Sequence, residues 1–199
     1  MTAIVVPFRG ASGKQRIDAP GELRAQLALA MLGDVVAACV ATARTLVVTS
    51  DPAAKGIVAA LGAEVVPDPG GGQGPAVAAA LAGLPDEPAL VVNADLPCVV
   101  PHDLCILASA AELGAFGLVE AEDGTTNALA LPQPSAFAPL YGPGSARRFR
   151  EHAANVGLQA VAAAIPNLSD DVDTMADLER LAYRAAPRTQ AALGMLVRL

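Results

Sequence analysis

The chain has 199 residues, enough for one domain over residues 1–199 with a sizeable buried core. Hydrophobic residues make up 53% of the chain but aromatic residues only 3%, so the core is expected to consist of alanine, valine and leucine. The formal net charge of −7 argues against general binding to nucleic acid or to an anionic membrane, because an acidic surface repels both.

Several features favour a cytoplasmic protein without a membrane partner. The cysteines Cys39, Cys98 and Cys105 are odd in number and include no CxxC pair, so a disulfide framework is not expected. The first residues, MTAIVVPF, lack a basic region and predict a first strand, not a signal peptide. The most apolar stretch, LALAMLGDVVAACVATA, is interrupted by Asp34 and is too short for a bilayer span once it is cut there.

Short runs rich in valine and leucine alternate with longer runs rich in alanine and leucine. The predicted strands are Ala3–Val6, Thr45–Thr49, Glu64–Pro67, Ala89–Asn93, Gly117–Glu120, Asn127–Leu131 and, more weakly, Gln159–Ile165. The predicted helices are Glu22–Ala43 (with an optional break at Gly33), Ala53–Leu61, Ala76–Leu84, Pro101–Leu113, Ala146–Asn155 and Met175–Ala185. This alternation predicts a single-domain α/β fold, with a mainly parallel sheet and helices on both of its faces.

A cationic loop, PFRGASGKQRI, follows the first predicted strand. It carries Arg9, Lys14 and Arg16 among glycine and serine, so backbone N–H groups and cations are both available to an anion. The loop is no Walker motif, because Phe8 and Gln15 stand where that motif needs glycine and serine or threonine. Taken alone, the pattern is more typical of a solvated basic loop.

A glycine-rich loop, DPGGGQGP, precedes the third predicted helix. Gly70, Gly71 and Gly72 give flexible backbone that can approach a flat or anionic group. The dinucleotide fingerprint fails, because Pro75 occupies the place of its third glycine. A mobile surface turn is the alternative.

The run ALVVNADLP places Asp95 just beyond a predicted buried strand. Ligands of open parallel sheets bind beyond the carboxyl ends of the strands, so we expect this carboxylate to face a ligand crevice. The alternative is that Asp95 only caps a turn.

Two later motifs also combine small and polar residues at predicted element ends. Thr126 and Asn127 in EDGTTNAL begin a strand, and Ser145 in YGPGSARRF is predicted to N-cap a helix. Helix starts of this kind can bind anions, although ordinary capping needs no ligand.

The run DDVDTMADL has Thr174 and Asp177 in capping-box spacing, which predicts a helix that starts near Thr174. Asp173 lies just before that start, where a carboxylate either binds a metal or complements the helix dipole. Separate carboxylates with a cationic glycine loop and no histidine relay favour phosphoryl chemistry with Mg²⁺, which prefers carboxylates and phosphate oxygens.

These motifs, in this order, resemble the 2-phospho-L-lactate and phosphoenolpyruvate guanylyltransferases of coenzyme F420 biosynthesis. The resemblance spans about residues 3–181 and implies a nucleotide-diphospho-sugar-transferase-like (Rossmann-like) fold. It also implies that a small phosphorylated acid attacks the α-phosphorus of GTP and expels pyrophosphate, with Mg²⁺ as cofactor.

The resemblance further implies roles for individual residues. Asp95 and Asp173 would bind the metal, with Asp95 also catalytic, and Lys14 and Arg16 would bind the triphosphate. The acid-substrate site would comprise Arg9, Thr126, Asn127, Gly142, Gly144 and Ser145, and the nucleotide site Gly70, Gly71, Gly72 and Asn93. Arg9 stands where the family commonly has lysine, and Gln15 replaces a hydroxyl residue.

Two other functions stay open from the sequence. The chain could be another nucleotidyltransferase, such as a molybdopterin guanylyltransferase or a sugar-phosphate nucleotidylyltransferase, or a GTP-binding regulatory module without turnover. The identity of the acid (phosphoenolpyruvate, 2-phospho-L-lactate or 3-phosphoglycerate), the number of metals and the assembly, including a homodimer, are likewise open.

Overall fold

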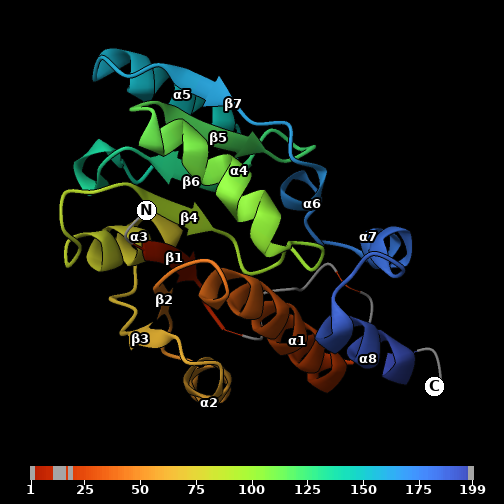
Figure 1. Cartoon of the computed structure of the whole chain (residues 1–199). Coiled ribbons are helices and arrows are strands. Elements are labelled where there is room, and N and C mark those ends of the chain that lie inside the picture. Colours follow the sequence, from red (N-terminus) through yellow and green to blue (C-terminus); the bar gives the residue numbers. More distant parts are fainter. Residues whose placement is uncertain (1–2, 11–16, 18–19, 197–199) are drawn as a thin grey trace.

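A computed structural model describes residues 3–10, 17 and 20–196 of the chain. Its seven strands form one sheet in the order β3-β2-β1-β4-β6-β5-β7 (Figure 1). The strands are β1 (Ala3–Pro7), β2 (Thr45–Val48), β3 (Glu64–Val66), β4 (Ala89–Val92), β5 (Phe116–Glu120), β6 (Thr126–Leu131) and β7 (Ala160–Ala162). Only β6 runs antiparallel to its neighbours, which confirms the predicted mainly parallel α/β sheet.

Helices cover both faces of the sheet, as predicted (Figure 1). They are α1 (Gly21–Val40), α2 (Pro52–Ala60), α3 (Gln73–Leu81), α4 (Pro101–Glu112), α5 (Ser145–Asn155), α6 (Pro166–Ser169), α7 (Met175–Leu181) and α8 (Pro187–Leu196), with a 3-10 turn at Pro134–Ala136. Ile4 and Val6 of β1 pack with α1 and α4, whereas Val5 packs with α3 on the opposite face. Burial on both faces explains why the central strands β1, β2, β4 and β6 read as apolar runs.

Helix α1 runs unbroken through Gly33, so the optional break there does not occur. By length and composition α1 could cross a membrane, but 56% of its apolar window is buried inside the protein. The buried carboxylate of Asp34 accepts hydrogen bonds from the backbone N–H groups of Arg188 (3.2 Å) and Thr189 (2.7 Å) in α8. A side chain in one helix therefore caps the start of another, which the sequence analysis did not predict.

One hydrophobic core lies on each face of the sheet. A smaller third core packs three loops against α7 and α8. Its buried members are Ile17, Leu27, Met31, Cys98, Val172, Leu178, Leu181 and Ala192. Ile17 is the last residue of the cationic loop, Cys98 follows Asp95, and Val172 precedes α7. This core therefore anchors segments that carry candidate functional residues.

Candidate active site

Three carboxylates from distant parts of the chain meet beyond the carboxyl end of β4. They belong to Asp95, Asp171 and Asp173, called the trio below. One oxygen from each lies within 4.8 Å of the other two, and all three residues are partly buried. The backbone N–H of Val172 donates to the carbonyl of Asp95 (3.1 Å), which joins the two segments directly. The structure thus brings Asp95 and Asp173 together, as expected, and adds Asp171.

Asp171 is the residue that the sequence analysis missed. Val172 is completely buried while the aspartates on either side of it remain partly exposed, so one apolar anchor presents two carboxylates. The alternation Asp-Val-Asp in the sequence is the signal that could have identified Asp171, because burial of the middle side chain turns its neighbours away from the core.

The trio fits a divalent cation. Mg²⁺ binds oxygen ligands at about 2.1 Å, so two ligands on opposite sides of one ion lie about 4.2 Å apart. The three carboxylate oxygens lie within 4.8 Å of one another, so small side-chain rotations would bring all three onto one ion. Asp177 has another task, since its carboxylate accepts from the N–H of Thr174 (2.8 Å) while the Thr174 hydroxyl caps α7. This confirms the predicted capping box and leaves Asp173 in the trio.

Asn93 links the glycine-rich loop to the end of β4. Its carbonyl oxygen accepts from the side chain of Gln73 (2.7 Å), the first residue of α3, and its amide donates to the carbonyl of Thr126 (3.1 Å). Gly70, Gly71 and Gly72 all have positive φ, from +80° to +108°, and Gly72 immediately precedes α3. The residues expected at the nucleotide site are therefore neighbours in the structure.

The expected acid-substrate residues cluster where β6 and α5 begin. The hydroxyl of Ser145 donates to that of Thr126 (3.0 Å), and both side chains are buried. Ser145 is not the N-cap of α5, contrary to the prediction, because its side chain bonds across to β6 and Gly144, with φ of +69°, takes that position. Gly142 also has a positive φ, of +110°.

Arg148 fixes the loop that contains Gly142 and Gly144. Its guanidinium donates to the carbonyls of Leu140 (2.9 Å), Tyr141 (3.2 Å) and Pro143 (2.6 Å). This arginine therefore shapes the loop, and its hydrogen-bonding capacity is largely committed to backbone carbonyls.

The cationic loop is described only at its ends. Arg9 is exposed just after β1, the strand that pairs in parallel with β4, so it lies at the same edge of the sheet as Asp95. Lys14 and Arg16 lie outside the described residues.

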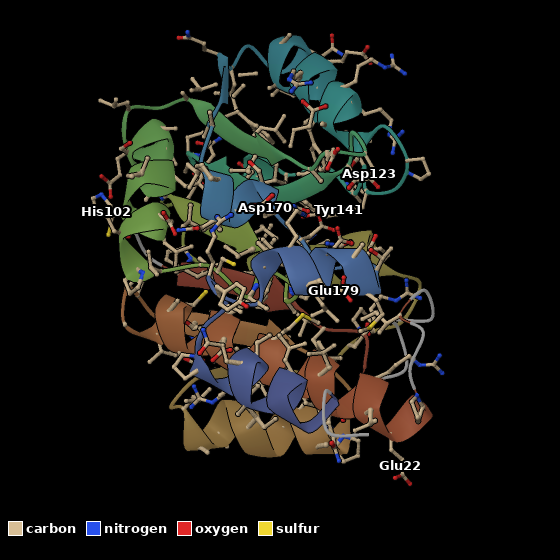
Figure 2. The ribbon with its side chains drawn as sticks, turned by 90° about the vertical axis from the view of Figure 1, so that its right-hand side faces the viewer. Glu22, His102, Asp123, Tyr141, Asp170 and Glu179 are labelled. Atoms are coloured by element: carbon tan, nitrogen blue, oxygen red, sulfur yellow. The ribbon has the colours of Figure 1, made fainter. Side chains whose placement is uncertain are left out.

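A pocket of about 250 Å³ adjoins the trio and is strongly acidic. Its lining residues are Glu122, Asp123, Ser169, Asp170, Asp171, Asp173, Asp177 and Arg180; Figure 2 shows this face, with Asp123 and Asp170 labelled beside α7. Arg180 (2.7 Å) and Arg184 (2.9 Å) both bind the Asp170 carboxylate. Burial raises the pKa of Asp170, but these hydrogen bonds outweigh it and leave that pKa below its ordinary value.

Asn127 contacts the trio from β6. Its amide group donates to the carbonyl of Ser169 (3.1 Å) and to the carboxylate of Asp171 (3.3 Å), and the residue is buried. The structure thus assembles carboxylates, glycine loops and buried hydroxyls around one end of the sheet, an arrangement suited to binding a phosphorylated ligand with a cation.

Known proteins resemble this chain in sequence and, separately, in fold. Residues 22–168 match the model of the MobA-like NTP transferase domain. A curated phosphoenolpyruvate guanylyltransferase of Thermomonospora curvata is 40% identical over 95% of this chain and 87% of its own length.

Two solved structures share the fold at low sequence identity. A candidate nucleotide-diphospho-sugar transferase of Desulfovibrio desulfuricans superposes with a TM-score of 0.76 at 16% identity, over 98% of this chain and 94% of its own. Glucosyl-3-phosphoglycerate synthase of Mycobacterium tuberculosis, solved with Mn²⁺ and uridine diphosphate, gives a TM-score of 0.58 at 13% identity, over 81% and 69% of the two chains.

Proposed function

Because the chain belongs to the MobA-like NTP transferase domain family, and within it to the phosphoenolpyruvate guanylyltransferases, we propose that it transfers GMP from GTP to a small phosphorylated acid. The acid is phosphoenolpyruvate or 2-phospho-L-lactate, and the reaction serves coenzyme F420 biosynthesis in the cytoplasm. The observation that carries the proposal is the meeting of Asp95, Asp171 and Asp173 beyond the carboxyl end of β4.

In the proposed reaction a phosphate oxygen of the acid forms a bond to the α-phosphorus of GTP. The bond from that phosphorus to the bridging oxygen of the β-phosphate breaks, and pyrophosphate leaves. The chain contributes by positioning both substrates and by neutralising their charge, which is how proteins accelerate phosphoryl transfer. Catalysis by positioning and charge neutralisation agrees with a site that has no histidine relay.

Each group of residues has a part in this scheme. Thr126 would donate its hydroxyl hydrogen bond to the acid substrate, and Ser145, which donates to Thr126, would orient that hydroxyl. Gly142 and Gly144, which have no side chains, would leave room for the acid. The loop at 70–72 and Asn93 would hold the guanosine. Lys14 and Arg16 would neutralise the triphosphate, and Arg9 would bind the acid substrate.

Asp95, Asp171 and Asp173 would hold Mg²⁺, a hard cation that takes carboxylate oxygens together with substrate phosphate oxygens. Bound there, Mg²⁺ would neutralise charge on the triphosphate and on the departing pyrophosphate. The glucosyl-3-phosphoglycerate synthase that shares the fold was solved with Mn²⁺ and a nucleoside diphosphate, which supports a divalent cation as a cofactor.

The experiment is mass spectrometry of products from GTP and Mg²⁺ mixed with phosphoenolpyruvate, 2-phospho-L-lactate or 3-phosphoglycerate. We expect a guanylylated acid and pyrophosphate with one of the first two acids. Asp95→Asn is expected to abolish the product with the fold intact by circular dichroism. Asp86→Asn, the same change at an exposed site before β4, is the matched control and should retain activity.

Three outcomes would contradict the proposal in different ways. Product from ATP or CTP but not GTP would indicate another nucleotidyltransferase. GTP binding without product from any acid would indicate a regulatory module. Near wild-type turnover by Asp95→Asn would remove the metal role from that carboxylate.

A further inference from the structure

Asn127 is built into the site in an unusual way for a substrate-binding residue. It lies in β6 between buried neighbours and is only 2% exposed, and both N–H donors of its side chain already have acceptors within the protein. Its amide group donates to the Ser169 carbonyl and to the Asp171 carboxylate. Both partners are acceptors, so the N–H₂ group, and not the amide oxygen, has to face the Asp171 segment.

The backbone of Asn127 reaches the other carboxylate-bearing segment. Its carbonyl accepts from the backbone N–H of Asn93 (2.9 Å), two residues before Asp95. One residue therefore bonds to both segments whose carboxylates meet. Of the trio, Asp95 comes from the first segment, and Asp171 and Asp173 come from the second.

We propose that Asn127 is a positioning residue, which holds the Asp171 carboxylate at the distance and orientation that a divalent cation requires. This inference rests on the metal site of the proposed function and gives Asn127 a different role from the substrate contact that the sequence suggested. Three neighbouring carboxylates repel one another, so a hydrogen bond to one of them opposes its rotation away from the other two. The amide of Asn127 makes such a bond to Asp171, as hydrogen-bond partners orient the ligands of metal ions in other proteins.

The substitution Asn127→Ala removes both side-chain hydrogen bonds and leaves the three carboxylates in the chain. Loss of such a partner typically weakens metal affinity by about 10- to 100-fold, and we expect an effect in that range here. The measurement is Mn²⁺ binding by electron paramagnetic resonance, with Mn²⁺ as the probe and without substrates, so it does not depend on turnover.

The chain offers a matched control in Asn167. This half-buried residue of α6 also donates its amide N–H to an aspartate, Asp103 (3.0 Å), outside the trio. A role limited to general stability would make Asn127→Ala and Asn167→Ala alike, whereas the proposal requires Asn167→Ala to keep Mn²⁺ affinity within about twofold. Melting temperatures of both variants report the structural cost separately.

A double-mutant cycle tests whether Asn127 acts through Asp171. In an Asp171→Ala background, Asn127→Ala should change Mn²⁺ affinity by less than about twofold, because the acceptor at position 171 is already gone. If Asn127→Ala fails to fold, Asn127→Ser serves instead, since the serine hydroxyl is too short to reach either partner.

Wild-type affinity for Mn²⁺ in Asn127→Ala, or an unchanged affinity with a raised KM for the acid, would overturn the proposal. So would the absence of Mn²⁺ binding by the wild-type protein at millimolar concentration. If no NTP and acid gave product but Asn127→Ala still weakened Mn²⁺ binding selectively, the proposed reaction would fall and the positioning role would stand.

Discussion

The buried side chain of Val172 connects the packing of the third core to the position of the carboxylate trio. A substitution at Val172 tests this connection. Val172 is 0% exposed and packs in the third core with Cys98, Leu178 and Leu181, while Asp171 and Asp173 flank it. Val172→Ala removes two methyl groups. At about 0.8 kcal/mol each for transfer, plus a cavity contribution, the free energy of unfolding should fall by about 2–3 kcal/mol.

The same substitution should loosen the two aspartates that the valine anchors. We expect Mn²⁺ affinity to fall by at least about fivefold, or ~1 kcal/mol. Urea unfolding followed by circular dichroism gives the stability, and titration with Mn²⁺ gives the affinity. Since small domains are typically stable by about 5–15 kcal/mol, the variant should remain folded.

The matched control is Val58→Ala in α2, which removes the same two methyl groups from a position that is also 0% exposed, in a core with none of the trio. It should lose similar stability and keep Mn²⁺ affinity within about twofold. Equal weakening of Mn²⁺ binding by both variants, or none by Val172→Ala, would refute the reasoning.

Three further predictions concern other contacts. Asp34→Ala leaves two N–H groups at the start of α8 without their charged acceptor and should cost about 3 kcal/mol in urea unfolding, whereas Asp34→Asn should cost less; equal costs would contradict the capping role. Arg148→Lys cannot reproduce the planar fork to three carbonyls, so the KM for the acid should rise with Mn²⁺ affinity unchanged; an unaltered KM would argue against loop shaping. The pKa of Asp170 is lower in the folded protein than in the unfolded chain, where it is about 3.9. Its ion pairs therefore contribute fully to the free energy of unfolding above a pH of about 3.9, and this contribution is lost as the pH falls through the folded pKa. Because its arginine partners are 45% exposed, this contribution should be about 1 kcal/mol or less. The stability difference between wild type and Asp170→Asn should shrink as the pH falls into the acid range, and a difference that does not change with pH would exclude the ion pairs as its source.

The sequence by itself determined the elements whose signals are local. Continuous apolar runs placed all seven strands, and the spacing of Thr174 and Asp177 placed the start of α7. It also indicated Asp95, because a carboxylate after a buried parallel strand has to emerge at the ligand-binding edge of the sheet.

Only the tertiary structure decided which side chains meet there. Asp171 joins Asp95 because Val172 is buried beneath α7, and Asn127 bonds to Asp171 from 44 residues away. Helix α8 begins where Asp34, 154 residues earlier, accepts the N–H of Arg188. Capping and periodicity act within a few residues, whereas these contacts depend on strand order and helix docking, which no short stretch of sequence encodes.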